Sequence, residues 1–111
     1  MSQQPKIEIT PEQVEIVQTI LVTYLPSKSS VFVFGSRAKG NPKPHSDLDL
    51  AIDADGQPLN LVNIGQLNEA FDESLLPYKV DIVDLNTLDQ EFKKLIETDC
   101  IEFKISQGYK I

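Results

Sequence analysis

Residues 31–53, VFVFGSRAKGNPKPHSDLDLAID, constrain the fold of this 111-residue chain more than any other segment. Four consecutive apolar residues, 31–34, predict a short strand that is buried on both faces and ends at Gly35. A loop rich in turn-forming residues follows, and residues 47–52 then carry large apolar side chains at alternate positions. This alternation predicts a second strand with one apolar face and one acidic face.

The acidic face of the second strand could bind metal ions. Asp47 and Asp49 are two residues apart, so both side chains project from the same face. Their α-carbons should lie about 7 Å apart. Carboxylates at this spacing can converge on one or two Mg²⁺ ions, and a cation would relieve their mutual repulsion. A solvated acidic face is the alternative, and the D-x-D pattern alone does not distinguish the two.

The end of the first strand could bind phosphate. A strand that ends at glycine lets the backbone approach a ligand closely. A helical turn after Gly35 would direct free N–H groups at phosphate oxygens, and the Ser36 hydroxyl would be a further donor. Arg37 is a charged partner either for phosphate or for a structural cap. A Gly-Ser pair is a common turn, but its position between a buried strand and an acidic strand makes the combination specific.

A third carboxylate could complete a two-metal site, and the predicted strand 79–84 offers two candidates. Asp81 and Asp84 are three residues apart and point to opposite faces, so only one can join the cluster. We assign Asp81, because a charge inside a strand is costly without a cation. Asp84 ends the strand, where a turn or cap is sufficient explanation, and Asp53 is likewise expected in a turn.

The remaining elements predict one α/β (α+β) domain. Apolar residues at helical spacing predict three helices, at residues 11–25, at residues 59–74 and after a capping box at 87–90. Thr10 and Gln13 form the capping box of the first helix. Alternation over residues 101–105 predicts an edge strand. The order α-β-β-α-β-α-β predicts a small mixed sheet of about four strands flanked by helices, in a single domain over residues 1–111.

Composition excludes several functional classes. With 10 basic and 17 acidic residues, the net charge of −7 argues against direct nucleic-acid binding. No segment approaches the roughly 20 apolar residues of a membrane span, and the N-terminus lacks the apolar core of a signal peptide. The single cysteine, Cys100, is expected as a packed thiol in the cytoplasm. Arg37, Lys39, Lys43 and His45 could attract a polyphosphate, although such a loop is ordinary by itself.

The three-part pattern GSRAKG, SDLDLAID and VDIVDL closely resembles the nucleotidyltransferase superfamily that includes DNA polymerase beta. The closest likeness is to its minimal nucleotidyltransferases (MNT), and it covers residues 31–53 and 78–85. The resemblance implies the polymerase beta-like palm fold, with phosphates held at Gly35 and Ser36. It also implies metal binding at the aspartates, with Asp81 helping to deprotonate the attacking hydroxyl. We therefore predict nucleotide binding by Gly35, Ser36 and Arg37, and catalysis and metal binding by Asp47, Asp49 and Asp81.

The resemblance implies a transferase that uses Mg²⁺, two ions being expected, and ATP as the default donor. Its relatives of this size resemble the antitoxin half of a toxin–antitoxin pair, in which the small transferase adenylylates a tyrosine of a HEPN ribonuclease. We therefore expect a HEPN-family partner in a hetero-oligomer, without a membrane. Two alternatives stay open: a non-catalytic antitoxin that binds by contact alone, and a transferase whose small-molecule acceptor is bound by a partner subunit.

Overall fold

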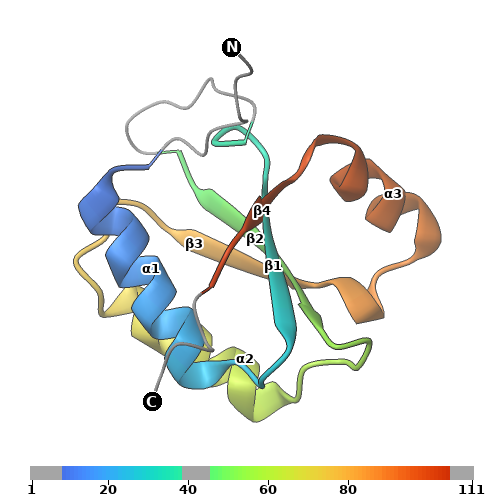
Figure 1. The fold of residues 1–111 in the computed structure, drawn as a ribbon, viewed down its shortest axis with the longest axis horizontal. Coiled ribbons are helices and arrows are strands. Elements are labelled where there is room, and N and C mark those ends of the chain that lie inside the picture. The colour runs from blue at the N-terminus through green and yellow to red at the C-terminus, as the bar shows by residue number, and fades with distance from the viewer. Residues whose placement is uncertain (1–8, 39–45, 106–111) are drawn as a thin grey trace.

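The computed structural model describes residues 9–38 and 46–105, which form a mixed four-stranded sheet with three helices (Figure 1). In chain order the elements are α1 (Pro11–Tyr24), β1 (Ser29–Phe34), β2 (Leu48–Ala54), α2 (Leu61–Asp72), β3 (Val80–Asp84), the 3₁₀ turn η1 (Leu85–Thr87), α3 (Gln90–Asp99) and β4 (Ile101–Phe103). The predicted order and fold class are confirmed. The basic loop residues Lys39, Lys43 and His45 lie outside the described residues.

The strands lie in the order β3-β2-β1-β4. β1 is antiparallel to both β2 and β4, whereas β2 is parallel to β3. A parallel pair needs a crossover connection, and α2 supplies it between β2 and β3. β4 is an edge strand, as predicted, and β2 lies in the interior of the sheet between β1 and β3, the strand of Asp81.

The two faces of the sheet are covered differently. On the core face, alternate strand residues such as Val33 and Leu50 pack with α1 and α2 and are fully buried. On the opposite face, Ile96 of α3 packs with Leu85 and Ala51 and covers only part of the sheet. Figure 1 shows α3 well apart from α1 and α2. β1 was predicted to be buried on both faces, and this is wrong for one of them: its alternate residues are buried on the core face and only half-buried on the other.

The predicted helix cap is correct at α1 and wrong at α3. In α1, Gln13 N donates to Thr10 Oγ1 at 3.2 Å and Thr10 N donates to Gln13 Oε1 at 3.1 Å, which confirms the capping box. The capping box predicted at 87–90 is wrong. Asp89 caps α3 instead by accepting from Phe92 N at 2.9 Å. Thr87 belongs to η1, where its hydroxyl donates to the main chain at the end of β3.

The apolar periodicity of α2 is correct at its centre and wrong at its ends. Leu67 and Phe71 are buried in the main core, as their spacing predicts. Leu61 and Leu75 follow the same spacing but are 84% and 90% exposed. The helix ends at Asp72, so Leu75 lies beyond it. Leu61 is the first residue of the helix and lies at its exposed N-terminal end.

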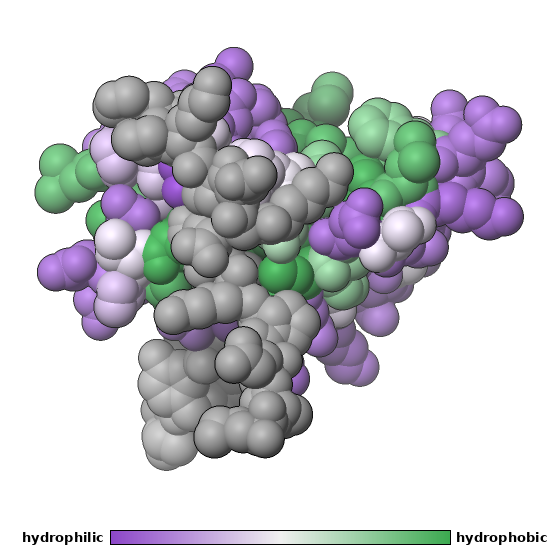
Figure 2. Space-filling model, turned by 90° about the horizontal axis from the view of Figure 1, so that it is seen from above, coloured by the Kyte–Doolittle hydropathy of each residue, from purple (hydrophilic) through white to green (hydrophobic). Residues whose placement is uncertain are grey.

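α3 buries less of its apolar surface than its spacing predicts. Ile96 is buried, whereas Phe92 and Leu95 are 45% and 71% exposed. Apolar and hydrophilic residues lie next to one another on this side of the molecule, the right-hand side of Figure 2. Within the described part of the chain, no helix has the length and apolar character that crossing a membrane requires.

Asp84 joins the end of β3 to the segment that leads into α2. Its side chain is 8% exposed, and it accepts from Leu59 N at 2.7 Å and from Asn86 N at 3.0 Å. Both donors are main-chain N–H groups, which need an acceptor, and the Asp84 carboxylate supplies it. Asp84 therefore has the structural role expected of it.

We expect Asp84→Asn to lower the free energy of unfolding by about 1–3 kcal/mol, because an amide retains one acceptor and turns an NH₂ group toward a main-chain donor. Urea denaturation measures this change. Asp55→Asn is the matched control, since Asp55 lies exposed in a turn with a φ of 57°, which asparagine also adopts. A loss no larger than that of the control would contradict the role of Asp84.

Candidate active site

The strand register brings Asp49 and Asp81 together from positions far apart in the chain. Asp49 on β2 is paired with Asp81 on the parallel neighbour β3. Paired residues on adjacent strands project to the same face, and the strands lie about 4.8 Å apart. On the other side of β2, Asp49 is paired with Phe34, the last residue of β1. We call the face that carries Phe34, Asp49 and Asp81 the open face.

Gly35 packs directly against the Asp49 carboxylate. It has a φ of 79°, a conformation that residues with a Cβ rarely adopt. A Cβ at this position would overlap the Asp49 carboxylate and lie 3.3 Å from Asp49 Cγ. Ser36 is half-buried in the turn that follows, which Ala38 N closes by donating to Gly35 O at 3.1 Å. Gly35 thus lies in close contact with the Asp49 side chain, and the predicted turn follows it. The close approach of a ligand at Gly35 stays a prediction.

Asp47 lies just before β2 and is exposed, one residue outside the strand predicted to contain it. Its charge acts on Asp49 nonetheless. The pKa of Asp49 is raised from the ordinary 3.8 to about 6, first by burial, then by the charge of Asp81, and then by that of Asp47. Lys79 Nζ lies 3.8 Å from Asp81 Oδ1, but both groups are well exposed, so water screens this ion pair.

The predicted metal ligands fit a divalent cation in their chemistry. Carboxylate oxygens are the ligands that Mg²⁺ prefers. The pKa of Asp49 is raised by burial first and then by the charges of Asp81 and Asp47, and a cation would offset both effects. Over residues 9–38 and 46–105, no three acidic, histidine or cysteine side chains already converge on one point. Asp49 and Asp81 are side by side, and Asp47 would have to turn toward them to complete the set.

Arg37 is buried rather than directed to solvent. Its side chain is 5% exposed, and its Nε and Nη2 donate to Ser46 O at 3.1 and 2.9 Å. Its guanidinium carbon lies 3.9 Å from the centre of the Tyr78 ring. These contacts favour the structural role that the sequence left open for Arg37. Phosphate binding by Arg37 stays a prediction.

Tyr78 is a residue near the site that sequence reasoning missed. It is 9% exposed, and its hydroxyl donates to Gln13 Oε1 at 2.9 Å. Burial raises its pKa, while the neighbouring Arg37 acts in the opposite direction. Its partners are distant in the chain, so no local pattern signals these contacts. In the sequence, Tyr78 is only an aromatic residue that precedes the predicted strand 79–84, and nothing marks it as a site residue.

Two further predictions concerned residues that could be mistaken for site residues. Asp53 accepts from Gly56 N and from Asn86 Nδ2, each at 2.8 Å, which confirms its turn role, although β2 extends past it. These bonds lower its pKa, the one from Asn86 most. Cys100 is partly buried against the apolar cluster under α3, and burial raises the pKa of its thiol. It is a packed thiol, as predicted.

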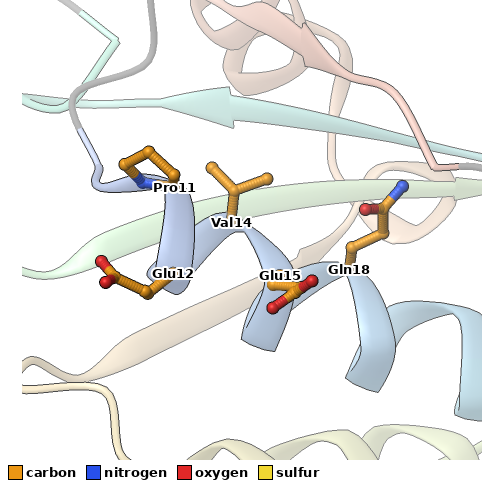
Figure 3. Close-up of a pocket in the computed structure, with 5 residues that line it drawn as sticks. All are labelled: Pro11, Glu12, Val14, Glu15 and Gln18. Atoms are coloured by element: carbon orange, nitrogen blue, oxygen red, sulfur yellow. The ribbon is translucent and has the colours of Figure 1, made fainter.

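A depression of about 460 Å³ along α1 does not have the features of a nucleotide site (Figure 3). Among the described residues, those that line it all come from this one helix, and they include Glu12 and Glu15, whose charges would repel a polyphosphate. α1 packs on the core face, opposite the open face. The site supported by the geometry is therefore the end of the open face at Gly35, Asp49 and Asp81.

Comparison with known proteins shows the family of this chain. Residues 15–103 match the family described as polymerase beta, nucleotidyltransferase. The chain belongs to this nucleotidyltransferase family. It is 43% identical over 91 residues to the probable protein adenylyltransferase MntA of Haemophilus influenzae, covering 82% of this chain and 78% of MntA. It is 37% identical over 73 residues to the putative protein adenylyltransferase MJ1217 of Methanocaldococcus jannaschii, covering 65% and 72% respectively.

Solved structures share the fold. A crystal structure of a toxin–antitoxin with AMP-PNP superposes with a TM-score of 0.70 at 23% identity, covering 86% of this chain and 76% of the other. The MNT antitoxin complex with the tri-AMPylated HEPN toxin of Shewanella oneidensis gives a TM-score of 0.57 at 20% identity, with the same coverage. These likenesses support the predicted nucleotidyltransferase fold.

We expect Gly35→Ala to lower stability more than Gly56→Ala. The two glycines have nearly the same φ, 79° and 80°, so both substitutions share a strain of about 1 kcal/mol. A Cβ at Gly56 meets nothing within 4 Å, whereas one at Gly35 overlaps Asp49. The overlap should add about 1–3 kcal/mol. Urea denaturation of both variants measures the difference, and equal losses would contradict the packing of Gly35 on Asp49.

We expect Asp49→Asn to stabilise the metal-free protein at pH 7 and not at pH 4. Because the folded-state pKa of Asp49 is about 6 and its ordinary value is 3.8, its charged form opposes folding as the pH rises through this range. A shift of two pKa units corresponds to about 3 kcal/mol, which solvent screening at this partly exposed group reduces to roughly 1 kcal/mol. Urea denaturation with a chelator tests this, with Asp55→Asn as control; a gain independent of pH would contradict it.

Proposed function

We propose that this chain is an Mg²⁺-dependent protein adenylyltransferase that transfers AMP from ATP to a tyrosine hydroxyl of a HEPN-family toxin and so acts as its antitoxin. The observation that carries the proposal is the pairing of Asp49 with Asp81 beside Gly35. Two like charges at one register are unfavourable in a sheet unless a ligand uses them. The glycine next to them brings the turn that carries Ser36 into direct contact with the Asp49 carboxylate.

Different residues of the chain would bind the phosphates, bind the metal ions and accept the proton. Gly35 and Ser36 hold the β- and γ-phosphates through the main chain and the serine hydroxyl. Asp47, Asp49 and Asp81 would hold two Mg²⁺ ions, which when bound stabilise the charge on the phosphates and on the attacking oxygen. Asp81 helps to accept the proton of that hydroxyl. The hydroxyl oxygen forms a bond to the α-phosphorus, the bond from that phosphorus to the bridging oxygen breaks, and pyrophosphate leaves.

The choice of acceptor is supported by the relatives. Two relatives that are 43% and 37% identical carry the name protein adenylyltransferase. Structures with the same fold include a toxin–antitoxin with AMP-PNP and an MNT antitoxin with an AMPylated HEPN toxin. The net charge of −7 suits a basic, RNA-directed partner. A hetero-oligomer in the cytoplasm, where ATP and a reduced cysteine are both found, is the setting we infer.

We expect the purified chain, with Mg²⁺ and α-labelled ATP, to label its HEPN-family partner. Asp47→Asn, Asp49→Asn and Asp81→Asn should each reduce labelling about 100-fold or more, because each removes part of a cation site that contributes several kcal/mol. Asp55→Asn, which removes an exposed charge outside the site, should label normally.

The same assay separates the alternatives. Labelling that survives Asp49→Asn would contradict the assigned site. A stable complex that forms without any label and still neutralises the toxin would favour a non-catalytic antitoxin. Pyrophosphate release that requires an added small-molecule hydroxyl, with no label on the partner, would favour a transferase with a small-molecule acceptor.

A further inference from the structure

Arg37 connects the two halves of the candidate site. Both Nε and Nη2 donate to the same oxygen, Ser46 O, across nine positions of the sequence. Arg37 directly follows Ser36 of the phosphate turn, and Ser46 directly precedes Asp47. A charged side chain that is only 5% exposed is rare in proteins unless partners such as these satisfy it. The guanidinium therefore ties the turn after β1 to the start of the acidic strand.

Tyr78 supports the guanidinium from the side. Its ring centre lies 3.9 Å from the Arg37 guanidinium carbon, a distance at which the planar cation is attracted to the ring. The Tyr78 hydroxyl donates to Gln13 Oε1, which also accepts from Thr10 N in the cap of α1. The ring is thus held between the first turn of α1 and the guanidinium.

The residue after Tyr78 is bonded to the acidic strand as well. Leu48 N donates to Lys79 O at 2.8 Å, immediately ahead of the pairing of Leu48 with Val80. The ring of Tyr78 and the start of β2 are therefore attached to the same short segment. A change in the ring's support would be transmitted to Ser46 through Arg37 and to Leu48 through the main chain, with Asp47 between them.

We propose that Arg37 and Tyr78 are a positioning pair that sets the spacing between the phosphate-binding turn at Gly35–Ser36 and the carboxylates of Asp47 and Asp49. The proposal rests on the proposed function of the site and names residues that act on it without touching the substrate. In transfer reactions a misplacement of about 1 Å can reduce the rate about 100-fold. A bond that limits the movement of Ser46 relative to Arg37 acts on that scale.

Direct phosphate binding by Arg37 would have a different kinetic signature. In that case Arg37→Lys, which keeps the charge, should mainly raise KM for ATP and should not depend on Tyr78. In the positioning role, Arg37→Lys should lower kcat, because an ammonium group can neither direct two N–H groups in one plane nor stack on the ring in the same way. Tyr78→Leu should then lower kcat as well, although Tyr78 is remote from any phosphate.

The experiment measures two properties of the full-length chain for Arg37→Lys, Tyr78→Leu, Tyr78→Phe and the double variant Arg37→Lys/Tyr78→Leu. The first is kcat and KM for adenylylation of the partner. The second is the affinity of the isolated chain for Mn²⁺, followed by electron paramagnetic resonance. We expect Arg37→Lys and Tyr78→Leu each to lower kcat about tenfold or more, with KM for ATP changed less than about threefold. Mn²⁺ affinity should fall in both.

The double variant and the conservative variant test the coupling. If the two residues act through one contact, the double variant should be no worse than about the worse single variant, since coupled residues are not additive. Tyr78→Phe keeps the ring and loses only the bond to Gln13, so it should retain most of the kcat that Tyr78→Leu loses. Phe71→Leu, which loosens the core away from the open face, controls for a loss of stability alone.

Three results would overturn the proposal: a rise in KM alone for Arg37→Lys, unchanged kcat and Mn²⁺ affinity for Tyr78→Leu, or strictly additive effects. If Tyr78→Leu does not fold, Arg37→Lys decides through its split between KM and kcat. If the wild-type chain labels no partner, the proposed function fails, and the Mn²⁺ affinities still decide whether Arg37 and Tyr78 position the carboxylates.

Discussion

The pairing of Asp49 with Asp81 is the constraint around which the rest of the structure is arranged. Like charges at one register destabilise a sheet, so the pairing must be imposed by other forces. The core face of the same strand imposes it, because Leu48, Leu50 and Ile52 are fully buried there. A slip of one residue would turn all three to the open face. Hydrophobic burial on one face therefore fixes an electrostatically unfavourable arrangement on the other.

The glycine beside this pair adds a second constraint at the same point. Gly35 has a positive φ and touches the Asp49 carboxylate, so the turn and the acidic strand approach more closely than any other residue would allow. Charge repulsion held in place by close packing is typical of functional sites, where stability is given up for geometry. The partial cover of the open face by α3 is consistent with this, since a fully covered sheet would leave no entry for a substrate.

The sequence predicted the features that depend on local pattern. Alternation in β2 predicted its two faces, and the three-residue spacing on β3 correctly separated Asp81 from Asp84. Features set by distant contacts were not predictable. The cap of α3 went to Asp89 because Thr87 was already bonded to the end of β3. The burial of Arg37 depends on Tyr78, 41 positions away, and no local pattern signals that contact.

The aspartates of the sheet fall into two groups that explain why only some are suited to bind a cation. Asp53 and Asp84 accept hydrogen bonds from main-chain N–H groups, which stabilise their charge and occupy their oxygens. Asp49 instead is partly buried and meets the charges of Asp81 and Asp47, and its pKa rises first because of burial and then because of those charges. A carboxylate already paired with N–H donors gains little from a metal ion, whereas one that faces other carboxylates gains the most. Hydrogen bonding thus distinguishes the structural aspartates from the candidate ligands, although both kinds lie on the same strands.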